Sequence, residues 1–422
     1  MSRRLLSIAL ICLVFSACNR SAPVPAIPGN RSTVETAAAN EASSLESAIG
    51  DYTVADPIRH ANLTIFPILS NTPRLEDPFI TLDEGLKAGT VEIREMGGRA
   101  QAARQRQGVA RAAASQSDSR GAADEVEDAD TGVDVDVTSS LIAGNEVNRL
   151  TVINRDSKPL YLMPGEIIVG GSQDRTIAEE IVIAATGEPV PIGVYCVESG
   201  RWGARDAELL AGVLDEVAED LSGDGAVVAA ANDGKFVAKA GNLSKSSRLA
   251  AQAGEGQQKV WEEVARANGA SGTAWESNAF TANYVDREVV ERLKPYLDAL
   301  ADVADQERIV GIVVAVNGKT ETVDVFGSTP LFRKLWPQLL KSFALDALQV
   351  ESLEDAKKTS ARLEAEAFLA SVLHDQQGDG PKTEGGLVVS RRETKEAVSF
   401  SAAAIGGMSA IYFPVHASGY KK

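Results

Sequence analysis

Apolar and polar residues alternate with a period of two in many short segments of this 422-residue chain. Successive side chains of a strand point to opposite faces, so this alternation predicts strands that bury one face. Gly, Pro, Asn and Asp separate the segments at intervals of about ten residues, which is typical of an antiparallel sheet or sandwich. In the first half of the chain, strands are predicted at residues 62–69, 90–96, 150–154, 160–163, 166–170, 176–183 and 189–197.

Helical spacing of apolar residues, at intervals of three and four, dominates the second half. It predicts helices at residues 206–220, 257–267, 285–300, 330–348 and 353–373. A short helix at 81–88, with Thr81 or Asp83 as its N-cap, precedes them. Pro295 is expected to kink or split the helix that contains it, because proline removes a helical hydrogen bond. Residues 221–256 are small, polar and rich in Gly and Ala.

Strand patterns return toward the C-terminus. Residues 309–316 and 320–326 flank Asn317-Gly318, which indicates a hairpin turn. Further strands are predicted at 387–389, 397–400 and 410–415. The whole pattern predicts an α+β fold, with a mixed, largely antiparallel sheet or sandwich followed by helices and a C-terminal hairpin region.

The N-terminus has the pattern of an export signal. Arg3 and Arg4 precede the apolar run 5–15, which is too short to span a bilayer but suits a signal peptide. The run ends in Phe15-Ser16-Ala17-Cys18, which resembles the bacterial lipoprotein processing box, although Phe15 replaces the usual Leu. We expect removal of residues 1–17 and a lipid on Cys18, so that the protein faces the periplasm or cell surface. Ordinary signal cleavage and a retained anchor are the alternatives.

Two further segments differ in composition from the rest. Residues 18–55 are rich in Ala, Ser, Pro and Asn, which predicts a disordered tether. Residues 98–139 combine an Ala- and Arg-rich half with an acidic half and hold almost no large apolar residues, which predicts a low-complexity charged insertion. The remaining residues, 56–97 and 140–422, are predicted to form a single α+β domain.

Composition narrows the class of protein. The chain has 42 Lys and Arg against 59 Asp and Glu, a net charge of −17, which becomes −19 when Arg3 and Arg4 leave with the signal (−17 − 2). This acidic balance argues against a nucleic-acid partner. Three cysteines and three histidines without ligand-like spacing predict no metal site, and no motif indicates a cofactor.

Two strings of residues connect the chain to a known family. They are PGEIIVGGSQDR at residues 164–175 and CVESGRW at residues 196–202. Together with Val260-Trp261, residues 311–317, 324–326 and 335–347, they resemble the ARG-and-Rhodanese-Phosphatase-superfamily-associated protein domain. The resemblance covers residues 60–97 and 140–417 and leaves the insertion outside. It implies association with ADP-ribosylglycohydrolase and phosphatase domains, and no established reaction.

Cys196 is the first candidate for chemistry, because of its residue type. After processing it is the one remaining thiol, but its strand places it on an apolar face with Ile192 and Val194, which favours a buried core cysteine. A nucleophilic cysteine needs a base or a positive field, and His416 is the histidine considered for that role. Glu198, together with Glu166, offers a carboxylate pair, with structural salt bridges as the alternative.

The polar residues of both strings form the second candidate site. A guanidinium suits a carboxylate or phosphate, and an indole stacks on rings, so these residues predict a ligand site. They are Gln173, Asp174, Arg175, Glu198, Arg201 and Trp202. In the alternative, they pair internally and fix the turns, Arg175 with Asp174 or a carbonyl and Arg201 with Glu166 or Glu198.

The function predicted from these observations is that of an envelope module that binds a small ligand or an envelope protein, held to the membrane by a lipid anchor. Two alternatives remain open. One is a hydrolase that acts on an anionic or ADP-ribose-like substrate, and the other is a purely structural envelope protein.

Overall fold

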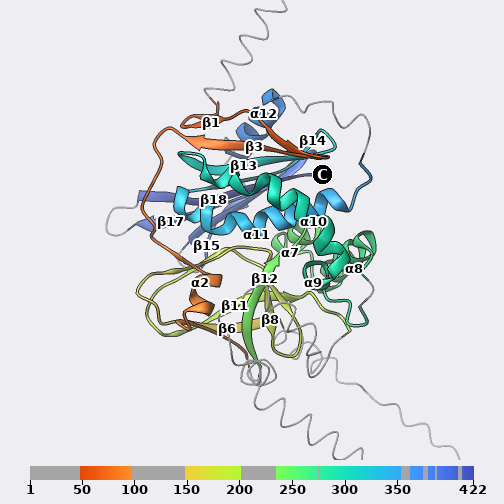
Figure 1. Ribbon diagram of the computed structural model, residues 1–422. Coiled ribbons are helices and arrows are strands. Elements are labelled where there is room, and N and C mark those ends of the chain that lie inside the picture. The colour runs from red at the N-terminus through yellow and green to blue at the C-terminus, as the bar shows by residue number, and fades with distance from the viewer. Residues whose placement is uncertain are drawn as a thin grey trace, which may run out of the picture. The chain divides into compact units, whose positions relative to one another are not determined.

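Figure 1 shows the computed structural model, which describes residues 48–96, 148–200, 234–273, 275–352, 362–373, 379–384, 387–406 and 411–422. These residues belong to one contiguous unit, Leu45–Lys422. Several of the predictions fall outside the described residues. They concern the signal, Cys18, the insertion at 98–139, the helix at 206–220, Arg201 and Trp202. The predicted α+β class and the largely antiparallel pairing are confirmed.

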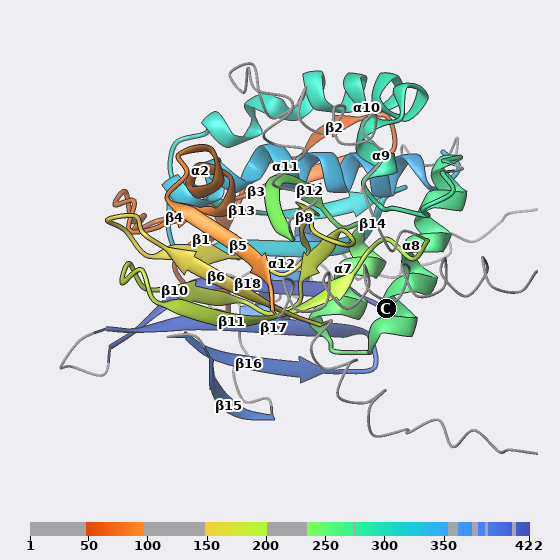
Figure 2. The ribbon, with the colours of Figure 1, turned by 90° about the horizontal axis from the view of Figure 1, so that it is seen from below.

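The larger sheet has nine antiparallel strands in the order β1-β3-β13-β14-β18-β17-β16-β15, with β2 paired to β3 as well. Figure 2 shows β15 and β16 at one margin of this sheet, beyond β17. The predicted turn joins β13 to β14, and Asn317 and Gly318 both have positive φ there, as a primed hairpin turn requires. The strands are Tyr52–Val54 (β1), Ile58–His60 (β2), Leu63–Ser70 (β3), Ile309–Val316 (β13), Lys319–Phe326 (β14), Asp379–Glu384 (β15), Leu387–Glu393 (β16), Ala397–Gly406 (β17) and Ile411–Lys421 (β18).

Six other strands close into a barrel in the order β11-β6-β5-β12-β8-β9, with β9 paired back to β11. Its interior contains Ile93, Val152, Ile168 and Val194, all of which are buried. The strands are Val91–Glu95 (β5), Arg149–Asn154 (β6), Glu166–Gly170 (β8), Arg175–Ile177 (β9), Pro189–Cys196 (β11) and Lys235–Asn242 (β12). A small sheet of Ile80–Thr81 (β4), Leu160–Leu162 (β7) and Ile181–Ile183 (β10) accompanies the barrel, and its β4–β7 pair is parallel.

Helices cover both faces of the nine-stranded sheet (Figure 1). On β13, Ile312 and Val314 pack in the same cluster as α11, whereas Val313 points the other way, into the cluster of α12. The helices are Leu82–Lys87 (α2), Lys245–Gln252 (α7), Gln257–Ser271 (α8), Ala282–Val285 (α9), Arg287–Leu300 (α10), Thr329–Leu348 (α11) and Arg362–Leu373 (α12), with a 3-10 helix at Ala301–Asp305. None of the helices in the described residues has the length and apolarity needed to cross a membrane.

Most predicted elements are confirmed, with four corrections. Strand β1 lies within residues 18–55, which were predicted to be a disordered tether, and its Val54 is buried against the sheet. The strand predicted at 176–183 is two strands, β9 and β10, because the chain leaves the barrel between them and buries the side chain of Glu180 there. Helix α10 continues through Pro295 without a split, since Pro295 lies on the exposed side, where water can satisfy the carbonyl that loses its donor. Strand β12 and helix α7 lie within the Gly- and Ala-rich stretch that gave no helical or strand pattern.

Candidate functional site

The two characteristic strings of the sequence meet on adjacent strands. Strand β9 begins at Arg175 and pairs antiparallel with the end of β11, so that Arg175 lies opposite Cys196. The polar residues Gln173 and Asp174 come just before β9, and Glu198 follows β11. Antiparallel pairing therefore brings together five of the predicted site residues, which we call the motif cluster: Gln173, Asp174, Arg175, Cys196 and Glu198.

Arg175 holds the centre of the motif cluster. Its Nη1 donates to the Oε1 of Gln173 at 3.0 Å and to the sulfur of Cys196. Its Nη2 lies 3.8 Å from the Oε1 of Glu95, a half-buried carboxylate on β5. The internal partners of Arg175 are thus a neighbouring amide, a thiol and a distant glutamate, rather than Asp174.

The other polar side chains of the motif cluster bind backbone groups or a hydroxyl. Gln173 donates its Nε2 to the carbonyl of Glu198 at 2.7 Å, and a carboxylate oxygen of Glu198 accepts from the backbone N–H of Asp174 at 3.0 Å. Asp174 in turn accepts from the hydroxyl of Thr281 at 2.9 Å. These three residues are fully buried. The contacts lock the turn before β9 against the end of β11.

Helix α8 completes the frame around Cys196. The side-chain amide of Gln257, the first residue of α8, accepts from the backbone N–H of Cys196 and donates to its carbonyl, both at 2.8 Å. The amide therefore replaces a neighbouring strand at this position. The thiol is 1% exposed, and burial raises its pKa, while the guanidinium of Arg175 acts in the opposite direction. A buried thiol with a raised pKa is a weak nucleophile.

Exposure rises steeply just after the motif cluster. Glu198 is buried, Ser199 is half-buried and Gly200 is exposed. The backbone of Gly200 is fixed where it emerges, because its N–H donates to the carbonyl of Ser277 at 2.9 Å. A Cβ on Gly200 would lie 2.6 Å from the carbonyl oxygen of Glu276, so the close approach requires glycine. Arg201 is the next residue in the sequence.

His416 belongs to a second cluster and binds two carboxylates. Its Nδ1 lies 3.2 Å from Glu180, its Nε2 lies 3.0 Å from Asp324, and its ring stacks on Phe326 with centroids 4.4 Å apart. Burial by itself lowers the pKa of His416, but the two carboxylates raise it to about 9. His416 is therefore an imidazolium held by two acids at neutral pH, and not a base for Cys196.

Arg248 provides the second cation of this cluster. From α7 it makes two hydrogen bonds to Asp324, of 3.0 and 2.7 Å, and its guanidinium lies 5.5 Å from the ring centre of Tyr420. Burial opposes ionisation of Asp324, but Arg248 and His416 keep its pKa below the usual range. Tyr161 donates to Glu180 at 2.6 Å and completes what we call the ionic cluster, formed by Tyr161, Glu180, Arg248, Asp324, His416 and Tyr420.

Sequence reasoning pointed to one member of the ionic cluster, His416, and missed the others. The first string contained one indication of the ionic cluster, namely the glycine at position 165, just before Glu166. Gly165 has φ +89°, and a Cβ there would lie 2.8 Å from the Cγ of Arg248. The side chain of Arg248 therefore packs directly against this glycine. Glu166 itself forms a buried ion pair with Lys239 of β12. Glu166 and Glu198 therefore have different partners, Lys239 for Glu166 and the backbone of Asp174 for Glu198.

The model of one protein family matches residues 51–411, which is most of the chain. Its description is ARG and Rhodanese-Phosphatase-superfamily-associated Protein domain. The chain belongs to this family. No curated protein and no solved structure matches the chain significantly.

The family description records an association with other domains and names no reaction. In this ARG and Rhodanese-Phosphatase-superfamily-associated chain, both characteristic strings contribute residues to the motif cluster. The first string also packs Gly165 against Arg248 of the ionic cluster. In the part of the chain that the structure describes, no group of three or more His, Cys, Asp or Glu side chains is arranged so that it could hold a metal ion. The geometry thus explains the strings as parts of a rigid frame that ends at an exposed position.

Proposed function

We propose that this protein is a non-enzymatic binding module, and that its motif cluster holds Arg201 and Trp202 for contact with a ligand. The observation that carries this proposal is the passage from the buried Glu198 to the exposed Gly200 over two residues. A side chain that follows directly after a fixed backbone position loses less conformational entropy on binding. The buried members of the string support the site, and the last two members provide the contacts.

The chemistry of these two residues indicates the class of ligand. Arginine presents a planar fork of donors that matches phosphate or carboxylate oxygens, and tryptophan stacks on aromatic or sugar rings. An anionic ligand with a ring, such as a nucleotide or ADP-ribose, combines both features. An acidic segment of an envelope protein that carries an aromatic residue has the same chemistry.

The hydrolase alternative has less support, for reasons that concern the proposed catalytic groups. Cys196 has a buried thiol whose pKa is raised, and Arg175 is its hydrogen-bond partner. His416 is held as a cation by Glu180 and Asp324. A general base must be unprotonated and within reach of the nucleophile, and His416 is held in the opposite state by other residues.

We also propose that the protein is exported and anchored in a membrane through a lipid on Cys18. The support is the order of a short basic start, an apolar run and Ser16-Ala17-Cys18. Metabolic labelling of bacteria with an alkyne fatty acid should label the full chain, and Cys18→Ala should remove the label. A label that persists in Cys18→Ala would show that the lipid is attached elsewhere.

Ligand binding is tested by thermal shift on the full chain with nucleotides, ADP-ribose and envelope saccharides. We expect at least one of these ligands to raise the melting temperature, since a ligand that binds only the native state stabilises it. Arg201→Ala and Trp202→Ala should abolish the shift and keep the melting temperature of the free protein. Arg175→Ala, in contrast, should lower that temperature, because it empties the centre of the motif cluster.

Two results would contradict this proposal. One is the absence of a shift with every ligand, which favours a purely structural protein. The other is a shift that Arg201→Ala and Trp202→Ala leave unchanged, which would place the ligand elsewhere on the molecule.

A further inference from the structure

A polar groove runs beside α12 at the end of the nine-stranded sheet, away from the motif cluster in the sequence. It consists of two adjoining hollows of about 370 and 640 Å³, which share Ser371, Thr394, Glu396 and Ala397. Residues of α12, of the β13–β14 turn, of the β16–β17 turn and of the C-terminal end line it. We call it the α12 groove. Its volume suits a small molecule.

The charges of the α12 groove reverse those of the chain. Acids outnumber bases in the whole sequence, 59 to 42. Among the described residues that line the groove, five are basic and three are acidic. The basic residues come from three separate segments: Lys319, Arg392 with Lys395, and Lys421 with Lys422. Cations that gather from distant segments of an acidic protein create a local positive potential in a concave surface, where the field is focused.

Several of these cations remain available to a ligand. The ammonium of Lys421 lies 4.8 Å from the ring centre of Phe368, which is a weaker partner than a carboxylate. Lys319 and Lys395 are exposed, and neither forms an ion pair with a carboxylate of the described residues. On the acidic side, Glu321 is already neutralised by its ion pair with Lys245 of α7.

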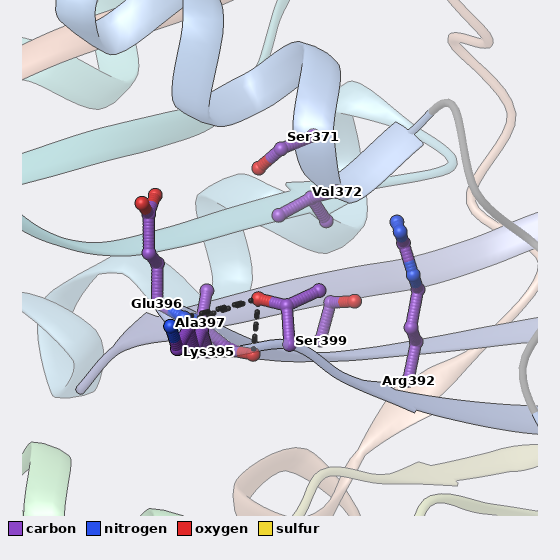
Figure 3. Close-up of a pocket in the computed structure, with 8 residues that line it drawn as sticks. Ser371, Val372, Arg392, Lys395, Glu396, Ala397 and Ser399 are labelled. Atoms are coloured by element: carbon purple, nitrogen blue, oxygen red, sulfur yellow. Dashed lines mark hydrogen bonds between the residues drawn. The ribbon is translucent and has the colours of Figure 1, made fainter.

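The close view of the smaller hollow shows how its polar groups are directed. Arg392 and Glu396 extend from the strands toward α12, at opposite ends of the hollow, with Ser371 and Val372 above them (Figure 3). The hydroxyl of Thr394 is fixed by hydrogen bonds to the backbone of Ala397. Glu396 is thus the carboxylate that a negatively charged ligand would meet.

We propose that the α12 groove is a binding site for a small polyanion that carries phosphate or carboxylate groups. The groove offers ammonium and guanidinium groups from three segments together with the hydroxyls of Thr320 and Ser399, which are the groups that bind such oxygens. The site is independent of the one proposed around Arg201 and Trp202, since the two share no residue.

The test is isothermal titration of the full chain with two probes, inorganic pyrophosphate and citrate, which separate a preference for phosphate from one for carboxylate. We expect saturable binding of at least one probe that weakens as sodium chloride increases. The double variant Lys319→Gln/Lys395→Gln should weaken binding about tenfold, since each exposed cation contributes on the order of 0.7 kcal/mol. The control Lys87→Gln/Lys294→Gln, which removes two exposed lysines of other helices, should bind as the native chain does.

A variant with the opposite expected sign makes the test more specific. Glu396→Gln removes a carboxylate from the groove and should strengthen binding of the probe, because it removes a like-charge repulsion. Weaker binding of the probe in Glu396→Gln would mean that Glu396 does not repel it and would overturn the proposal. No saturable binding of either probe at millimolar concentration, or equal binding in the groove and control variants, would also overturn it. Neither result changes the thermal shift that we expect when a ligand binds at Arg201 and Trp202.

Discussion

The guanidinium of Arg248 donates a hydrogen bond to each carboxylate oxygen of Asp324 in the interior of the domain, and each residue is at most 2% exposed. Arg248 comes from α7 and Asp324 from β14, so the pair joins a helix to the nine-stranded sheet. The stem of Arg248 packs over Gly165, at the entrance to β8 of the barrel. One side chain therefore fixes three elements that are far apart in the sequence.

The contact with Gly165 predicts a strong effect of a small substitution. Gly165→Ala places a Cβ 2.8 Å from the Cγ of Arg248 and also forces a left-handed backbone on alanine. We expect a loss of at least about 3 kcal/mol of unfolding free energy, from backbone strain and from displacement of a buried cation. Urea denaturation followed by circular dichroism measures it.

A matched control separates these two causes. Gly254 also has positive φ, at +67°, but no atom lies within 4 Å of a Cβ built on it. Gly254→Ala should therefore cost only about 1–2 kcal/mol, the cost of the backbone alone. Equal losses of unfolding free energy in the two variants would mean that the contact between Arg248 and Gly165 contributes nothing to stability.

The imidazolium of His416 predicts a dependence of stability on pH. Its pKa rises from 6.5 in the unfolded chain to about 9 in the folded protein. A raised pKa means that the folded state binds the proton more tightly, so the stabilisation is complete below pH 6.5 and is lost as the pH rises through about 9. We expect a decrease on the order of 3 kcal/mol in the free energy of unfolding between pH 6.5 and 9.5, measured by urea denaturation.

Substitution shows whether His416 causes this decrease. His416→Gln should be less stable than the native chain at pH 6.5 by about 3–5 kcal/mol, because two buried carboxylates lose their shared cation, and its stability should change less up to pH 9.5. His60→Gln, which changes a histidine in β2 beside Tyr296, should keep the native slope. The same slope in native protein and His416→Gln would contradict the prediction.

Strands and helices were predictable where a local pattern decides them. The Asn317-Gly318 turn and the alternation in β11 are examples, since turn chemistry and side-chain direction depend on a few neighbouring residues. The closed barrel was not predictable, because it depends on the pairing of β5 with β12, about 140 residues later in the chain. The Gly- and Ala-rich composition of the β12–α7 stretch also hides its periodicity.

The candidate site was predictable in its members and not in its partners. The sequence singled out Arg175 and Cys196 because unusual polar strings surround them. It did not indicate Glu95 or Gln257, which lie about 60 to 80 residues away and reach Arg175 and Cys196 only after the barrel closes. Period two did predict the apolar face of Cys196, because burial follows strand geometry.

The burial of Cys196 predicts that its thiol resists alkylation in the native protein. In a Cys12→Ala/Cys18→Ala background, iodoacetamide should react with Cys196 only as fast as the domain opens, since reaction needs an exposed thiolate. The rate, measured by mass spectrometry, should rise with urea in parallel with unfolding. For comparison, Lys294→Cys on the exposed face of α10 in the Cys196→Ala background should react at once. Rapid alkylation of native Cys196 at pH 8 would refute its assignment as a structural cysteine.

Asp346, near the end of α11, predicts a stabilising substitution. Both of its carboxylate oxygens lie 3.1 Å from the backbone N–H of Lys245 at the start of α7. Burial nevertheless raises the pKa of Asp346 from 3.8 to about 7, against the effect of these hydrogen bonds. Between pH 4 and 7 the unfolded chain therefore releases a proton that the folded protein retains, and stability falls as the pH rises through this range.

Asp346→Asn removes this cost and keeps an oxygen that accepts from the N–H of Lys245. At pH 7.5 we expect the variant to exceed the native chain by on the order of 2 kcal/mol in urea denaturation. The gain should be much smaller at pH 4, where the folded carboxyl is neutral and the unfolded carboxyl is only about half ionised. Asp298→Asn, at an exposed position of α10, should show no comparable dependence on pH. If Asp346→Asn is destabilising at pH 7.5, the charge of the carboxylate stabilises the start of α7, and the burial of Asp346 has no net cost at that pH.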